Sequence, residues 1–84
     1  MPKKTNNSFL YTVYSKRNCS FCDRAIKLLT DYDNKVIVKK IDEETLYFKE
    51  MKEKAPNMKT MPVIFKDNEL IGGYSDLIEF LQNE

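Results

Sequence analysis

Two cysteines are the residues of this 84-residue chain whose type and spacing most clearly indicate chemistry. They are Cys19 and Cys22, in the segment Cys19-Ser20-Phe21-Cys22. At this spacing on a helix, two side chains lie on one face, one turn apart, so their sulfur atoms can form a small disulfide and release it again. A chain with no other cysteine does not use disulfides as a framework. The pair is therefore expected to take part in a reaction.

Cys19 is predicted to lie at the amino-terminal start of a helix, where free N–H groups and the helix dipole stabilise a thiolate. Lys16, Arg17 and Arg24 add positive charge nearby in the sequence. Both effects lower the pKa of the Cys19 thiol and favour its reactive form. Cys22 falls one turn further into the helix and is expected to be buried. The pattern predicts that Cys19 attacks a disulfide and that Cys22 resolves the resulting mixed disulfide.

Two other interpretations of the pair remain open. One is two ordinary buried cysteines at chance spacing. The other is half of a zinc site, although the sequence has no second CxxC segment and no histidine to complete four ligands. The lack of histidine also removes the commonest general base. We therefore predict that no residues of this chain form a metal site.

A second motif is Thr60-Met61-Pro62, which precedes an apolar segment. A cis Met61–Pro62 peptide bond would leave the Met61 backbone N–H and C=O free to pair with an extended peptide. Cis bonds make up only about 5–6% of X–Pro bonds in folded proteins. The pattern alone therefore favours a trans proline at the first residue of a strand.

The third motif is the segment 72–77, Gly-Gly-Tyr-Ser-Asp-Leu. A double glycine before a helix forms a backbone nest for a carboxylate, and Asp76 could bind an amine. A ligand with an amino-acid head group would satisfy both. The alternative is an ordinary capped helix with Ser75 or Asp76 as the N-cap.

Apolar periodicity predicts the elements that position these motifs. Strands are expected at 9–14, 36–41, 63–65 and 70–71, with a two-residue hairpin turn at 67–68. Helices are expected from residue 20 to about 30, from Asp42 or Glu43 to Pro56, and after Gly73. Phe48, Met51 and Ala55 should form the inner face of the second helix, and Tyr11, Phe48 and Phe65 should belong to the core.

The order β-α-β-α-β-β-α predicts a four-stranded mixed sheet flanked by three helices, because the first β-α-β unit requires parallel pairing and the late hairpin antiparallel pairing. The length fits one domain over 9–84, with 1–8 as a flexible polar tail.

Lysine and arginine number 14 against 13 aspartates and glutamates, which argues against binding of nucleic acid. No apolar run approaches a membrane span, and no secretory signal is evident. We expect a cytoplasmic monomer.

The three motifs, in this order, resemble those of a glutaredoxin of the thioredoxin superfamily, from about Phe9 to the carboxyl terminus. The resemblance implies a thioredoxin-like (glutaredoxin) fold of dithiol type with a Cys-Ser-Phe-Cys active site. It implies a glutathione-dependent thiol–disulfide oxidoreductase that reduces protein disulfides and glutathione mixed disulfides. The partners implied are glutathione and disulfide-containing or glutathionylated proteins.

Site residues follow from the resemblance position by position. Cys19 matches the nucleophile and Cys22 the resolving cysteine. The glutathione groove corresponds to Lys16, Phe21, Thr60, Met61, Pro62, Gly73, Tyr74, Ser75 and Asp76. Within it, Pro62 matches a cis proline, and residues 74–76 match the segment that holds the γ-glutamyl head group. Lys59 is a further candidate contact for a carboxylate.

Ser20 departs from the usual Cys-Pro-Tyr-Cys motif, which removes a rigid helix start. Relatives with serine there can hold a [2Fe–2S] cluster between two protomers, so a cluster-bound dimer is one alternative. A thioredoxin-type protein that draws electrons from a reductase is another, against which the segment 72–77 argues. A zinc-binding interaction module is the most distant alternative.

Overall fold

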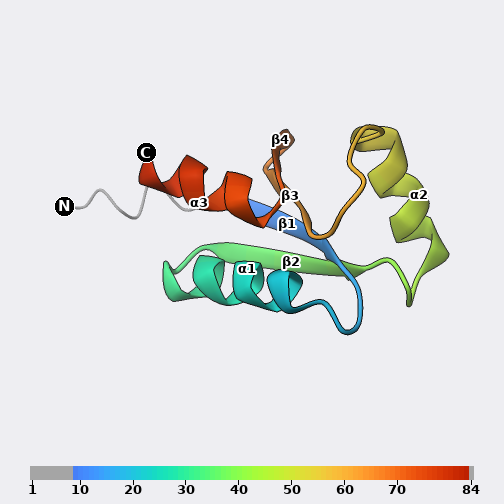
Figure 1. Ribbon diagram of the computed structural model, residues 1–84, viewed down its shortest axis with the longest axis horizontal. Coiled ribbons are helices and arrows are strands. Elements are labelled where there is room, and N and C mark those ends of the chain that lie inside the picture. Colours follow the sequence, from blue (N-terminus) through green and yellow to red (C-terminus); the bar gives the residue numbers. More distant parts are fainter. Residues whose placement is uncertain (1–8, 84) are drawn as a thin grey trace.

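The computed structural model describes residues 9–83, which form four strands and three helices (Figure 1). The elements along the chain are β1 (Leu10–Ser15), α1 (Ser20–Asp31), β2 (Lys35–Lys40), α2 (Thr45–Lys54), β3 (Val63–Lys66), β4 (Glu69–Gly72) and α3 (Tyr74–Gln82). The predicted order of elements is confirmed. The tail predicted for 1–8 lies outside the described residues.

The four strands form one mixed sheet in the order β2-β1-β3-β4. β1 and β2 are parallel, with Val13 opposite Val38, whereas β3 runs antiparallel to both β1 and β4. The predicted hairpin turn is confirmed, since Lys66 pairs with Glu69 across the two residues between them. Because β1 and β2 are parallel, the loops that follow them leave from the same edge of the sheet. One of those loops carries Cys19.

The core has two parts, one on each face of the sheet, because successive residues of a strand point to opposite faces. The part under α1 and α3 consists of Tyr11, Val13, Ala25, Leu29, Ile64 and Leu77. The part under α2 consists of Tyr14, Met51, Ala55, Val63 and Phe65. Buried apolar side chains thus fix α1, which follows Cys19, and α3, which begins within the segment 72–77, to the sheet. None of the helices among residues 9–83 is long and apolar enough to cross a membrane.

Polar contacts attach α2 to the sheet as well. The Tyr14 hydroxyl donates a hydrogen bond to Glu50, and Lys39 Nζ donates to the same carboxylate at 2.5 Å. The bond from Lys39 is the largest of the effects that lower the pKa of Glu50. Burial, followed by the contact with Glu50, raises the pKa of Tyr14 above its ordinary value. The ion pair therefore joins β2 to α2 over a buried tyrosine.

Two predictions about α2 are wrong. The helix begins at Thr45, because the N–H groups of Glu43 and Glu44 bond to the Lys40 carbonyl and close a turn. Phe48 is 46% exposed, because the face of α2 that is turned toward the sheet passes through Tyr47 and Met51 instead. The second strand, which was expected at 36–41, lies at the edge of the sheet, and Ile37 is 41% exposed.

Candidate active site

Cys19 and Cys22 form a disulfide at the start of α1, with their Cα atoms 5.3 Å apart. Cys19 is the N-cap residue of the helix, and its Sγ accepts a hydrogen bond from the Cys22 N–H at 3.2 Å. Cys22 is 1% exposed, whereas Cys19 is half-buried. The geometry suits the predicted roles: the sulfur that an incoming disulfide can reach belongs to Cys19, and the same N–H that bonds it would stabilise its thiolate.

The basic residues around Cys19 are not all available to its sulfur. Arg17 donates from its backbone N–H and from Nε to Asp42, at 3.0 and 3.2 Å. The guanidinium of Arg24 lies over the Phe21 ring, 5.5 Å from its centroid. Lys16 is exposed and makes no hydrogen bond or ion pair within residues 9–83. Arg17 and Arg24 therefore contribute less to the field at Cys19 than their sequence positions suggest.

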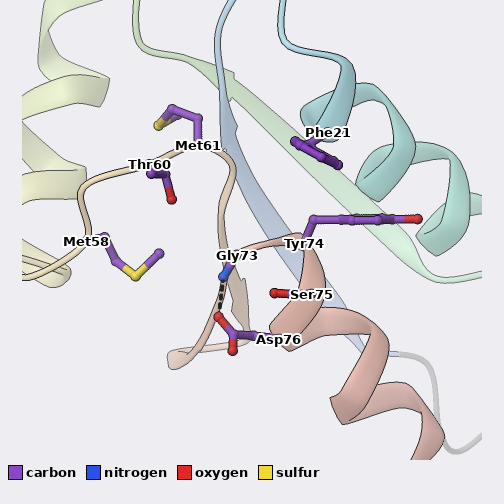
Figure 2. A pocket seen from close by; sticks show the side chains of 8 residues that line it. All are labelled: Phe21, Met58, Thr60, Met61, Gly73, Tyr74, Ser75 and Asp76. Carbon is purple, nitrogen blue, oxygen red and sulfur yellow. Dashed lines mark hydrogen bonds between the residues drawn. The ribbon is translucent and has the colours of Figure 1, made fainter.

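Beside the cysteine pair is an open pocket of about 380 Å³, built from three separate segments of the chain (Figure 2). Its lining residues are Phe21, Met58, Thr60, Met61, Gly73, Tyr74, Ser75 and Asp76. Phe21 and Tyr74 stack on one side, with ring centroids 5.7 Å apart and an interplanar angle of 29°. The fold thus brings together α1, the loop before β3 and the start of α3.

Seven of the residues predicted for the groove line this pocket, and two do not. Pro62 is buried next to it, and its bond to Met61 is cis, as the resemblance implied and as the pattern alone did not. The Met61 backbone takes part in none of the loop and cap hydrogen bonds of residues 9–83. Lys16 is exposed and is not among the lining residues, and the same is true of Lys59.

The start of α3 is built by the double glycine and Asp76. Gly73 is the N-cap, and its N–H donates to Asp76 Oδ2 at 2.9 Å, as drawn in Figure 2. Neither Ser75 nor Asp76 is the N-cap, so that alternative is wrong. Gly72 has φ +125°, where side chains are rarely tolerated. Because residue 72 has no side chain, there is room beside it for the Asp76 carboxylate, which lines the pocket.

Met58 is the lining residue that the sequence analysis missed. Its thioether faces the pocket from the side opposite the aromatic stack (Figure 2). Its N–H bonds to the Ala55 carbonyl at 3.2 Å, just after α2 ends. The residue lies outside every motif, and its only sequence signal is closeness to Thr60.

The residues around the pocket are poorly suited to bind a metal ion. Within 9–83, no group of three or more His, Cys, Asp or Glu side chains could hold an ion. An iron–sulfur cluster would therefore need most of its ligands from outside the chain. Cys19, as the more exposed cysteine, is the residue that could contribute one.

The comparisons with known proteins agree with this geometry. A sequence model of the glutaredoxin family matches residues 11–71, more than half of the chain. A dithiolic glutaredoxin from Trypanosoma brucei brucei is 30% identical, with a TM-score of 0.73 over 87% of this chain and 77% of its own. The holo form of glutaredoxin C1 from Populus tremula x tremuloides is 26% identical, with a TM-score of 0.73 over 88% and 75%.

One further structure is similar in fold. The buckwheat glutaredoxin–glutathione complex is 22% identical, with a TM-score of 0.76 over 89% of this chain and 70% of its own. At this identity the likeness establishes the fold alone. A comparison with curated protein sequences finds no match.

Proposed function

This chain belongs to the glutaredoxin family and is a thiol–disulfide oxidoreductase, and from that premise we propose that its reductant is glutathione. The observation that carries the proposal is the pocket beside the cysteine pair, where the segments 58–61 and 73–76 face Phe21. A pocket with a backbone edge and a carboxylate indicates a small ligand with peptide character.

Each part of the pocket would bind a different part of glutathione. The Met61 N–H and C=O would pair with the backbone of its cysteine. The amino-terminal turn of α3 would receive the γ-glutamyl carboxylate, and Asp76 would receive the amino group. The Phe21–Tyr74 stack, 5.7 Å between centroids, would form an apolar wall along the ligand. Lys16 would approach the glycine carboxylate from the rim.

In a monothiol cycle, the Cys19 thiolate attacks the glutathione sulfur of a glutathionylated substrate. The substrate thiol leaves with the electron pair of the broken S–S bond and takes up a proton, and Cys19 is left bonded to glutathione. A second glutathione thiolate then attacks that glutathione sulfur. Cys19 is released as a thiolate and glutathione disulfide forms. Each mixed disulfide reduced therefore consumes one free glutathione, because the other half of the glutathione disulfide comes from the substrate.

In a dithiol cycle, Cys19 attacks one sulfur of a protein disulfide and forms a mixed disulfide. Cys22 then attacks the Cys19 sulfur, and the reduced substrate is released. The product is the Cys19–Cys22 disulfide, whose Cα separation is 5.3 Å in this structure. Two glutathione molecules return the pair to dithiol. Burial of Cys22 keeps it from competing for the first attack.

The proposed substrates are disulfide-containing and glutathionylated proteins, and a [2Fe–2S] cluster is the alternative ligand of Cys19. When bound, a cluster would supply electron transfer or serve as cargo, with one ligand from each Cys19 of two chains. Anaerobic purification that yields a coloured dimer would favour that alternative over a monomeric reductase.

The deciding experiment is reduction of a glutathione mixed disulfide, coupled to glutathione reductase and NADPH. We expect turnover that saturates with glutathione. Ser75→Ala and Asp76→Lys should raise KM for glutathione, because they alter the γ-glutamyl end of the pocket, and should have little effect when dithiothreitol is the reductant. Full activity of both variants with glutathione would favour a thioredoxin-type reductant. No turnover by the wild-type protein would refute the proposal.

A further inference from the structure

Two loops meet at the edge of the sheet where parallel strands β1 and β2 end. The loop after β1 leads to Cys19, and the turn after β2 contains Asp42. The Ile41 N–H donates to the Ser15 carbonyl at 2.9 Å, which extends the pairing of the two strands by one residue. Asp42 is thus brought next to Arg17, although 25 residues separate them.

A single carboxylate oxygen joins the two loops. Asp42 Oδ2 accepts the Arg17 backbone N–H at 3.0 Å and its Nε at 3.2 Å. The bond from the Arg17 backbone N–H is the largest of the effects that lower the pKa of Asp42, so the carboxylate is ionised at neutral pH. Asp42 itself lies in the turn closed by bonds from Glu43 and Glu44 to the Lys40 carbonyl, which makes it a fixed anchor.

The loop before Cys19 needs such an anchor. Asn18, between Arg17 and Cys19, has φ +56°, in the left-handed region that asparagine tolerates but does not prefer. The loop residues 16–18 are all exposed, so packing does not fix their conformation. The bond to the Arg17 N–H is the contact that holds the chain just before the reactive cysteine.

We propose that Asp42 is a positioning residue for the thiol–disulfide exchange: it holds the loop 16–18 through the Arg17 N–H and so keeps Cys19 in place to close its bond with Cys22. The oxidised protein benefits most from this contact. There the disulfide already restrains Cys19, so forming the bond to Asp42 costs less conformational entropy than in the reduced protein, where the loop is freer. Loss of the contact therefore destabilises the oxidised protein more, and the disulfide becomes easier to reduce.

The test is the equilibrium with dithiothreitol, in which the protein disulfide and reduced dithiothreitol give the protein dithiol and oxidised dithiothreitol. Asp42→Ala should shift this equilibrium toward the protein dithiol by about fivefold, since a charge-assisted hydrogen bond is lost. Asp42→Asn should shift it less, because the amide oxygen still accepts from the N–H. Using dithiothreitol makes the result independent of whether glutathione is the reductant.

Two controls separate this role from others. Arg17→Ala keeps the backbone N–H and should stay within about twofold of the wild type, since the guanidinium is not the anchor. Asp31→Ala removes another exposed carboxylate, paired with Lys27 at 3.3 Å, and should have no effect. An unchanged equilibrium in Asp42→Ala, or an equal shift in Arg17→Ala, would overturn the proposal. Should Asp42→Ala fail to fold, Asp42→Asn must still shift the equilibrium more than Arg17→Ala.

Discussion

Replacing Gly72 with alanine tests how the start of α3 is built. At φ +125°, a Cβ on residue 72 would lie 2.8 Å from Asp76 Cγ and 2.9 Å from Asp76 Cβ, closer than such atoms normally approach. The Asp76 side chain cannot move aside without losing its hydrogen bond to the Gly73 N–H. The substitution therefore combines backbone strain with the loss of a helix-start contact.

The size of the effect follows from these two costs. An unfavourable backbone conformation of this kind costs about 1–3 kcal/mol, and a lost hydrogen bond about 0.5–1.5 kcal/mol. We therefore expect Gly72→Ala to lower the free energy of unfolding by about 1.5–4.5 kcal/mol. For a domain of this size each kcal/mol is worth about 4–8 °C in Tm, so thermal unfolding should begin well below that of the wild type.

Gly73→Ala is the matched control on the neighbouring residue. Gly73 has φ −94°, and the nearest atom to an added Cβ is the Pro62 carbonyl oxygen at 3.6 Å, an ordinary contact. Its free energy of unfolding should stay within about 0.5 kcal/mol of the wild type. Circular dichroism during heating measures the Tm of both variants. In Gly72→Ala the KM for glutathione should also rise, because the Asp76 carboxylate is displaced. Equal stability of the two variants would refute this account of the turn.

Three further predictions concern the cysteine pair and the acid stability of the fold. Cys19→Ser should abolish all exchange, whereas Cys22→Ser should keep removal of glutathione from mixed disulfides; equal loss in both would contradict the monothiol cycle. Ser20→Pro should raise the free energy of unfolding by about 0.4–1 kcal/mol. Ser20 is the first residue of α1, and Cys19, at φ −122° and ψ 98°, already has the extended backbone that is preferred before proline. A lower Tm than that of the wild type would refute this. The pKa of Glu50 is below its ordinary value of 4.5 in the folded protein, so its contribution to stability is fully present above about pH 4.5 and is lost as pH falls through the folded value. Glu50→Gln should flatten the decline of stability with acid in denaturant titrations, and an unchanged slope would contradict the role of Lys39.

The features that sequence predicts well here are local. Apolar spacing from Cys22 onward identifies α1, and Cys22 is buried because it lies on the same helix face as Ala25 and Leu29. The order of strands and helices then determines which pairs are parallel. The cysteine geometry follows, because both residues belong to one helix turn and need no distant contact to place them.

The prediction that failed for Phe48 depends on how α2 is oriented on the sheet. Periodicity identifies the inner face of α2, with Met51 and Ala55 buried. It does not say how the helix is rotated on the sheet, where the buried face passes through Tyr47 and leaves Phe48 exposed. Met58 enters the pocket for a similar reason, since the path of the loop after α2 is determined by packing on the sheet, and no motif includes this residue.

Asp42 shows why contacts between loops are difficult to predict from the sequence. A negatively charged residue before a helical pattern resembles a helix start, and this local signal favoured a start at Asp42 or Glu43. The competing signal lies at Arg17, and it becomes visible only once β1 and β2 are known to be parallel and in register. The bond to the Arg17 N–H uses the carboxylate that a helix start would have used.

The group that contacts the Cys19 sulfur in this structure is a backbone N–H, not Arg17 or Arg24. Asp42 holds the guanidinium of Arg17 and Phe21 lies against that of Arg24, so neither cation is free to pair with the sulfur. The Cys22 N–H, at 3.2 Å from Sγ, is fixed by the helix itself. A backbone donor stays in place whether the sulfur is bonded or ionised, so the chain need not reorganise between the two states of the cycle. Asp42 and the helix start then have complementary roles, since one holds the approach to Cys19 and the other stabilises its charge.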